Sequence, residues 1–189
     1  SIIPDQIEAG TFMFAAAATR GDVTVMNVIP KHLEATIAKL VEIGCEVEEF
    51  DDAVRVVSKG SLTSTHVKTL PYPGFPTDLQ SVLMAVLSVS SGLSLLEEKI
   101  FEARFQTVPE LRRMGASIQQ GEAFALIEGK ERLLGTDVKA EELRGGAALI
   151  MAAVAAEGKS RISGMEYVHR GYEDIQGDLK KLGVVVNYS

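Results

Sequence analysis

The sequence predicts an α/β domain in which one module, β-α-β-α-β-β, is used three times. The segment Leu-x-x-apolar-Gly recurs three times, and an earlier glycine precedes the final glycine of each copy by 23, 23 and 25 residues. A near-constant spacing of this kind indicates a structural repeat, and alternating strand and helix patterns within it indicate an α/β fold. The glycine pairs are Gly21 and Gly44, Gly92 and Gly115, and Gly158 and Gly183.

The first predicted module covers about residues 1–60. Gly44 stands where the C-terminus of a helix favours a left-handed residue, and Asp51-Asp52 is typical of the turn in a hairpin. The expected elements are a strand at 2–3, a helix at 8–19, a strand at 23–28, a helix at 33–43, and hairpin strands at 46–50 and 53–58.

The second and third modules follow the same order over about residues 61–135 and 136–189. We expect the third to lack its last strand, because the sequence ends at Ser189 after the first arm of its hairpin. The second module is expected to contain a strand at 65–70, a helix at 79–89, a strand at 93–97, a helix at 108–114, and strands at 117–120 and 123–128. The third is expected to contain a strand at 138–143, a helix at 146–156, a strand at 160–163, a helix at 172–182 and a strand at 184–188.

The first helix of each module is apolar almost all round, as in 12–18 and 147–156. Such helices lie inside a domain and not on its surface. We therefore expect a single domain over residues 1–189, with the first helices inside and the sheets outside, in a pseudo-threefold arrangement.

Composition excludes several classes of protein. A net charge of -7, with no basic run interleaved with aromatics, argues against nucleic-acid binding. No stretch approaches the length of a membrane span, so we expect a soluble, cytoplasmic protein. The three histidines and the single cysteine lack metal-ligand spacing, and we expect neither a metal nor a cofactor. Cys45 is read as a small strand residue in preference to a nucleophile.

Asp78 follows a proline-rich loop and stands at the start of an apolar helix. One interpretation is a simple N-cap, because aspartate is favoured at that position. The other is a functional carboxylate, because equivalent positions of the modules also carry charge. Asp78 and Arg144 each precede their module glycine by 14 residues, and Arg104 and Arg170 each follow it by 12.

Under a pseudo-threefold, these four residues fall at the end of the domain where the first helices begin. Arginine offers forked donors for phosphate or carboxylate, and helix N-termini add backbone N–H groups, so an anionic ligand is favoured. The alternative is ordinary surface pairing, of Arg104 with Glu102 or Glu110 and of Arg170 with Glu173. Gly145-Gly146 could cradle phosphate or allow close helix packing, and no lysine follows as a P-loop requires.

Five segments of the sequence carry a resemblance to a known family. They are Ile3-Pro4-Asp5-Gln6-Ile7-Glu8-Ala9-Gly10-Thr11, Phe75-Pro76-Thr77-Asp78-Leu79-Gln80, Phe101-Glu102-Ala103-Arg104-Phe105, Val108-Pro109-Glu110-Leu111-x-x-Met114-Gly115-Ala116 and Arg170-Gly171-Tyr172-Glu173. They resemble the enolpyruvyl transferase family, in particular its branch in peptidoglycan synthesis, and the resemblance covers essentially the whole chain.

This resemblance implies an inside-out α/β barrel domain, two of which enclose the substrates in the family. The activity implied is transfer of enolpyruvyl from phosphoenolpyruvate to the 3-hydroxyl of UDP-N-acetylglucosamine, without a metal or organic cofactor. It also implies a part in cell wall formation, cell shape and cell division.

The resemblance assigns roles to five residues. Asp78 matches the aspartate that binds the sugar 3-hydroxyl and acts as its general base. Ile100 matches a residue that contacts UDP-N-acetylglucosamine through its backbone. Arg104, Arg144 and Arg170 match arginines of the anion pocket, and Arg170 is also counted among the catalytic residues.

Only the second of the family's two domains is resembled. The general acid of the family is a cysteine in the first domain, and Cys45 does not match it. We therefore expect these 189 residues alone to be inactive and to need the missing first domain as a partner. A transferase acting on shikimate 3-phosphate and a non-catalytic paralogue remain as alternatives.

Overall fold

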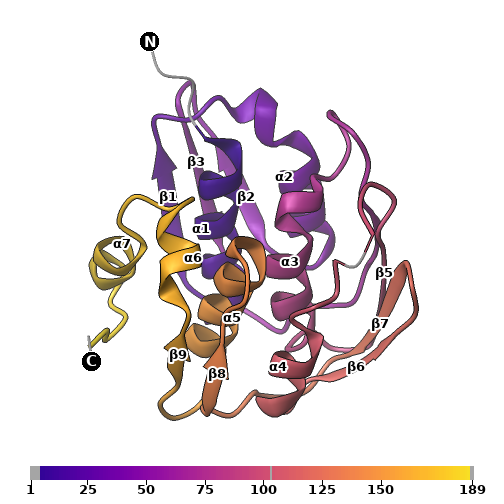
Figure 1. Cartoon of the computed structure of the whole chain (residues 1–189). Coiled ribbons are helices and arrows are strands. Elements are labelled where there is room, and N and C mark those ends of the chain that lie inside the picture. The colour runs from indigo at the N-terminus through magenta and orange to yellow at the C-terminus, as the bar shows by residue number, and fades with distance from the viewer. Residues whose placement is uncertain (1–4, 103, 188–189) are drawn as a thin grey trace.

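The computed structural model describes residues 5–102 and 104–187. Three helices lie at the centre of the molecule (Figure 1). They are α1 (Gln6–Thr19), α3 (Gln80–Leu87) and α5 (Leu143–Ala155), and each packs against the other two. Met13, Phe14, Leu83 and Met151 are fully buried where these helices meet. The prediction that the first helix of each module is internal is confirmed.

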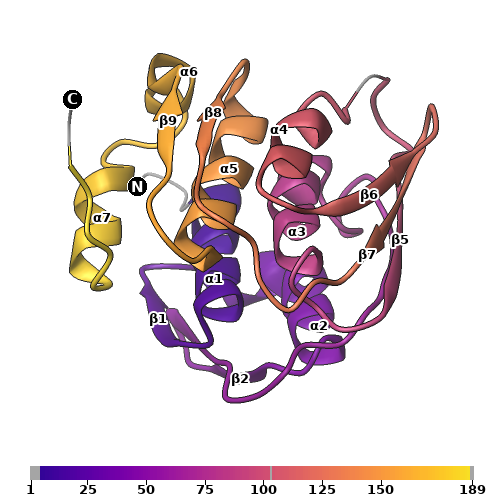
Figure 2. The same cartoon turned by 90° about the horizontal axis from the view of Figure 1, so that it is seen from below.

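Three separate sheets surround the central helices (Figure 2). The first is antiparallel, with the order β1-β3-β2, and its inner face packs against α1 through residues such as Val54 and Val56. The predicted hairpin is present, because the Phe50 N–H donates to the Ala53 carbonyl at 2.8 Å. The elements of this part are β1 (Asp22–Met26), η1 (Pro30–Leu33), α2 (Glu34–Glu42), β2 (Glu46–Glu49) and β3 (Ala53–Val57).

The second sheet has the order β4-β5-β7-β6, with β4 parallel to β5 and the other pairs antiparallel. Here all six elements of the predicted module are present, and the bounds of β5 and β6 are those that the sequence predicts. The elements are β4 (His66–Lys68), η2 (Thr77–Leu79), α3, β5 (Leu93–Glu97), α4 (Val108–Arg113), β6 (Ser117–Gln120) and β7 (Phe124–Glu128).

The third sheet has two parallel strands, β8 (Asp137–Lys139) and β9 (Arg161–Ser163). Two short helices follow β9, namely α6 (Met165–His169) and α7 (Ile175–Lys181). Among the described residues the three sheets do not join into a closed barrel. Helices and strands alternate along the chain, which confirms the predicted α/β class.

The third module departs most from its prediction. The helix predicted at 172–182 begins only at Ile175, because the Asp174 carboxylate accepts a hydrogen bond from the Gly177 N–H at 3.0 Å and caps α7 there. The helix α6 was not predicted. Residues 184–187 form no strand, so the strand predicted at 184–188 is wrong over that part. Residue 188 and the strand predicted at 2–3 lie outside the described residues.

The recurring glycines end helices as expected. Gly44, Gly115 and Gly183 have φ values of 113°, 98° and 91°, a region that side chains rarely adopt. The first module differs at its earlier glycine, because Arg20 takes the left-handed conformation there, with φ 52°. In the part of the chain that is described, no helix is long and apolar enough to cross a membrane.

Candidate active site

Asp78 lies in the single turn η2 that leads into α3. Pro76 precedes this turn in an extended conformation, and the Leu79 N–H donates to its carbonyl at 3.1 Å. The N-cap residues of η2 and α3 are Pro76 and Leu79, and neither makes a side-chain capping bond. The N-cap interpretation of Asp78 is therefore wrong, and its carboxylate is available for other partners.

Two guanidinium groups flank the Asp78 carboxylate. Arg104 Nη1 lies 3.5 Å from Oδ1, and Arg144 Nη2 lies 3.4 Å from Oδ2. The Asp78 side chain is 36% exposed, against 26% for Arg104 and 21% for Arg144. Two cations share one carboxylate, so the cluster keeps an excess positive charge that suits an anion. We call these three residues the Asp78 cluster.

The arginines of the cluster come from different parts of the chain. Arg144 is in the first turn of α5, and Arg104 follows β5 in the connection to α4, where its guanidinium lies 4.5 Å from the centre of the Phe101 ring. Surface pairing of Arg104 with Glu110 is not seen, since Glu110 pairs with Arg113 at 3.9 Å. Of the four residues at matched offsets from the module glycines, Asp78, Arg104 and Arg144 therefore lie together in the structure.

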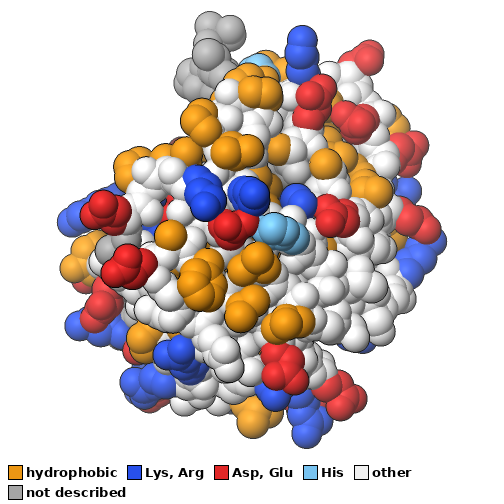
Figure 3. All heavy atoms as spheres, turned by 90° about the vertical axis from the view of Figure 1, so that its right-hand side faces the viewer, with side chains coloured by type: hydrophobic (Ala, Val, Ile, Leu, Met, Phe, Trp, Pro, Cys, Tyr) orange, Lys and Arg blue, Asp and Glu red, His pale blue; other side chains and the backbone are white. Residues whose placement is uncertain are grey.

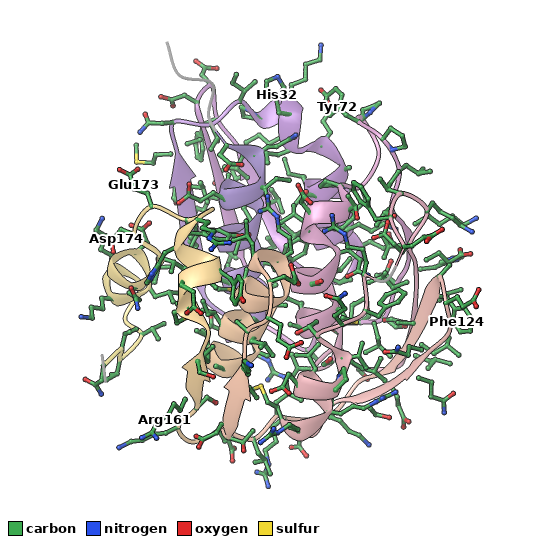
Figure 4. All side chains as sticks on the ribbon, viewed as in Figure 1. His32, Tyr72, Phe124, Arg161, Glu173 and Asp174 are labelled. Carbon is green, nitrogen blue, oxygen red and sulfur yellow. The ribbon has the colours of Figure 1, made fainter. Side chains whose placement is uncertain are left out.

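Arg170 makes no ion pair or hydrogen bond with Asp78, whose partners are Arg104 and Arg144. Its guanidinium lies 5.4 Å from the centre of the Tyr167 ring, and among the described residues it has no ion pair, with Glu173 or any other carboxylate. Its backbone is nevertheless close to the cluster, because a side chain at the next residue, Gly171, would collide with Leu143 at the start of α5. Glu173 and Asp174 lie farther out, beside α7 (Figure 4).

Ile100 lies in the loop that follows β5. Its N–H donates to the Glu98 carboxylate at 3.0 Å. An open groove runs beside this loop, lined by residues that include Ile100, Phe101 and Phe105, and its other wall is the turn at 120–123 between β6 and β7. Phe124, the first residue of β7, directly follows this turn and is labelled in Figure 4.

Sequence reasoning missed a buried hydroxyl pair behind the cluster. The Tyr172 and Thr11 hydroxyls are 2.7 Å apart, and Tyr172 is 1% exposed. Burial raises the pKa of Tyr172 and outweighs the opposing effects of the Thr11 hydrogen bond and of Arg144. This pair joins α1 to the segment behind Arg144. The signal that could have revealed it is Thr11, a polar residue within the otherwise apolar stretch 9–18 of α1.

The two glycines after Arg144 form no phosphate cradle. The N–H groups of Arg144 and Gly145 donate to the Glu142 carboxylate, which thus occupies the start of α5. A side chain at Gly146 would collide with Val168 of α6. Close helix packing explains this glycine, as the alternative reading of the sequence held.

The outer face of the second sheet carries interspersed positive and negative side chains (Figure 3). Glu97 accepts a hydrogen bond from His66 at 2.6 Å and pairs with Lys68 and Lys99. The His66 hydrogen bond, followed by the two lysines, lowers the pKa of Glu97. His66, Lys68 and Lys99 are each about half exposed, so this group is an ordinary solvated network of charges.

Cys45 precedes β2 and is 5% exposed. Burial raises the pKa of its thiol, against a weaker opposing effect of the neighbouring Ser58 hydroxyl. A buried thiol of raised pKa is not an activated nucleophile, which agrees with the structural interpretation of this residue.

The chain belongs to the enolpyruvyl transferase family. Residues 1–179 match the family model described as EPSP synthase (3-phosphoshikimate 1-carboxyvinyltransferase). The fold agrees with solved structures of the family. The enolpyruvyl transferase NikO from Streptomyces tendae superposes with a TM-score of 0.89 at 25% identity, over 98% of this chain and 44% of that one. EPSP synthase from Acinetobacter baumannii, at 19% identity and a TM-score of 0.79, over 100% of this chain and 47% of that one, shows the same fold.

Within this family, the chain is similar to proteins named UDP-N-acetylglucosamine 1-carboxyvinyltransferase. One from Desulfofundulus thermocisternus is 55% identical over 97% of this chain and 75% of its own length. Another, from Clostridium acetobutylicum and numbered 2, is 51% identical over 97% of this chain and 44% of its own length. A third, from Symbiobacterium thermophilum and numbered 3, is 53% identical over 98% of this chain. The chain thus spans less than half the length of the second and third of these relatives.

Proposed function

We propose that this chain is the second domain of a UDP-N-acetylglucosamine 1-carboxyvinyltransferase. The complete enzyme moves enolpyruvyl from phosphoenolpyruvate to the 3-hydroxyl of the amino sugar and releases phosphate. This is the first committed step of peptidoglycan synthesis, in the cytoplasm, and links the enzyme to cell shape and cell division. The observation that carries the proposal is the Asp78 carboxylate held between Arg104 and Arg144.

Asp78 acts in this proposal as the general base. It binds the sugar 3-hydroxyl and takes its proton when the oxygen attacks phosphoenolpyruvate. A base must lie within hydrogen-bond reach of that proton, so a carboxylate open to the surface, as Asp78 is, fits the role better than a buried one. The two guanidinium groups hold the carboxylate in place between them, 3.5 Å and 3.4 Å from its two oxygens.

Arg104, Arg144 and Arg170 hold the carboxylate and phosphate of phosphoenolpyruvate, and Ile100 contacts UDP-N-acetylglucosamine through its backbone. Preplaced cations stabilise negative charge that develops during addition and elimination. Arg170 stacks on Tyr167 and has no carboxylate partner among the described residues, so its charge is free for a ligand. The general acid comes from the first domain of the complete enzyme.

The proposal also covers the domain organisation of the chain. Residues 1–189 form one domain of three modules, at about 1–60, 61–135 and 136–189, in a pseudo-threefold, inside-out α/β barrel. The mutual packing of α1, α3 and α5 inside three outer sheets supports it.

The test is an assay of phosphate release by the complete two-domain enzyme. We expect release from phosphoenolpyruvate when UDP-N-acetylglucosamine is added, and none when shikimate 3-phosphate replaces it. Release with shikimate 3-phosphate alone would reject the substrate in favour of the other branch. No release with either acceptor would identify a non-catalytic paralogue.

A further inference from the structure

Glu98 is a buried carboxylate to which the proposed function gives no part. It follows β5, lies on the same face as the buried Ser94 and Leu96, and is 4% exposed. Among the described residues no cation pairs with it. A buried carboxylate requires compensating hydrogen bonds, since desolvation of an uncompensated charge is costly. Its partners therefore decide what this residue does.

Four donors surround the Glu98 carboxylate. Oε1 accepts from the Thr77 hydroxyl at 2.7 Å. Oε2 accepts from the Thr69 hydroxyl at 2.6 Å, from the Ile100 N–H at 3.0 Å and from the Phe101 N–H at 3.3 Å. The two oxygens thus serve two different segments, which we call the Thr77 side and the loop side.

Each side leads directly to a part of the candidate active site. On the Thr77 side, the bonded residue immediately precedes Asp78 in the turn η2. On the loop side, the bonded backbone belongs to Ile100 and to Phe101, whose ring lies under the Arg104 guanidinium. One carboxylate therefore fixes the general base relative to the loop that carries its cation.

We propose that Glu98 is a positioning residue for the transfer reaction: it sets Asp78 through Thr77, and sets Ile100 and Arg104 through the backbone of the loop. This inference rests on the proposed function. Displacing a catalytic group by about 1 Å can cost about 100-fold in rate, so a fixed separation between these segments has a direct effect on turnover.

The chemistry of the donors makes the two sides unequal. The Thr69 hydroxyl accepts from the Lys99 N–H at 2.8 Å, so its own proton is directed to Glu98. Backbone N–H groups can only donate, so Oε2 must remain an acceptor. In Glu98→Gln the amide nitrogen must therefore take the Oε1 position, where the Thr77 hydroxyl has to turn and accept. This substitution weakens the Thr77 side and spares the loop side.

The experiment uses the complete enzyme and compares single hydroxyl deletions. We expect Thr77→Val to lower kcat about tenfold with little change in KM, because it frees the base, and Glu98→Gln to resemble it. We expect Thr69→Val to raise KM for UDP-N-acetylglucosamine by about tenfold, because it frees the loop that contacts this substrate. Thr77→Ser keeps the hydroxyl and restores kcat to within about threefold of wild type.

The matched control is Ser88→Ala, at the opposite end of α3. It also deletes a buried hydroxyl bond, from Ser88 to the Met84 carbonyl at 2.9 Å, but far from the Asp78 cluster. It lowers the free energy of unfolding by a similar amount and leaves both kinetic constants unchanged. Equal kinetic effects of Thr77→Val, Thr69→Val and Ser88→Ala would overturn the proposal.

Hydrogen exchange in the same variants tests positioning independently of turnover. The Ile100 and Phe101 amides exchange faster in Thr69→Val than in wild type, and at the wild-type rate in Ser88→Ala. Unchanged exchange in Thr69→Val would also overturn the proposal. An inactive wild-type enzyme would instead reject the proposed function, while the exchange result would still decide whether Glu98 fixes the loop.

Discussion

The turn η2, which precedes α3, determines the position of Asp78. The residue sits inside η2, where its carboxylate turns toward Arg104 and Arg144 and away from the backbone N–H groups of the helix start. Exposed ion pairs of this length contribute little to stability, about 0–1 kcal/mol each. The arrangement is therefore better explained by its chemistry than by a contribution to folding.

Replacement of Asp78 by asparagine tests the general base. In the complete enzyme we expect Asp78→Asn to lower kcat by about 10²- to 10⁴-fold, because the amide cannot accept the hydroxyl proton. Binding of UDP-N-acetylglucosamine, measured by calorimetry, should weaken only modestly. Asp52→Asn in the exposed hairpin turn serves as the control and keeps full activity. Retained turnover in Asp78→Asn would reject the assignment.

Tyr172 tests the buried support of Arg144. Tyr172→Phe removes the hydroxyl bonded to Thr11, and we expect the free energy of unfolding to fall by about 1 kcal/mol, as for a typical buried hydrogen bond. Urea denaturation measures this change, and in the complete enzyme KM for phosphoenolpyruvate should rise as Arg144 loses its neighbour. Tyr72→Phe, at an exposed tyrosine, should change neither quantity.

The sequence predicted some contacts of single residues and missed others. Repeat offsets placed Asp78, Arg104 and Arg144 together because equivalent positions of a repeat lie at equivalent places in the fold. The offsets carry no information about side-chain direction, so they also suggested that Arg170 joins the others. Buried partners such as Glu98 escape this reasoning, because a charged residue at a strand end normally predicts exposure.

The helices and strands followed local sequence closely where glycine and apolar periodicity mark their ends. In the second module β5 and β6 have the predicted bounds. The failures lie where a side chain ends or starts a helix through a tertiary or capping contact, as at Asp174 before α7. Helix starts near Thr77 and Pro30 take a 3-10 form, which apolar periodicity does not distinguish from an α-helix.

The surroundings of Glu8, at the start of α1, disfavour its ionised form. Partial burial raises the pKa of Glu8, and repulsion by Asp5, Asp178 and Glu173 adds to it. A carboxyl group whose pKa is raised by folding contributes fully to stability below its unfolded value of about 4.3, and this contribution is lost as pH rises through the folded value.

Glu8→Gln should therefore raise the melting temperature near pH 7, where the wild-type carboxylate is ionised. Below about pH 3 the gain should vanish, because the wild-type group is then protonated in both states. Thermal unfolding followed by circular dichroism at several pH values measures the difference. A gain that is equal at both pH values would show that repulsion is not its cause.

The central helices α1, α3 and α5 stabilise the folded domain by packing their apolar side chains against one another. Leu83 of α3 is fully buried among the core residues. We expect Leu83→Ala to lower the free energy of unfolding by about 2–5 kcal/mol, because it removes apolar contacts and leaves a cavity. Leu93→Ala, at an exposed position of β5, should cost far less in the same chemical denaturation experiment.

As a whole, the molecule joins three unequal parts around one helical core. Residues from all three parts approach the Asp78 cluster, with Thr11 from α1, Asp78 before α3 and Arg144 in α5. The sequence predicted this assembly because each central helix is too apolar for a surface position. It also predicted that the third module lacks its last strand, but the strand that it predicted at 184–188 is not formed by residues 184–187.

The isolated chain should lack transferase activity. We expect no phosphate release from phosphoenolpyruvate and UDP-N-acetylglucosamine with the purified 189 residues, because the proposed general acid lies in the first domain. Addition of that domain as a separate polypeptide, or use of the complete enzyme, supplies the positive control. Phosphate release by the 189 residues alone would contradict this division of the chemistry.

Cys45 has a practical consequence for experiments on the whole molecule. It is the one cysteine of this chain, it is 5% exposed, and burial raises the pKa of its thiol, so thiol reagents should modify it slowly in the folded state. A cysteine introduced at an exposed site, such as Asp52 in the hairpin turn, would then take a maleimide dye or spin label selectively. The domain thus accepts a distance probe without prior removal of its native thiol.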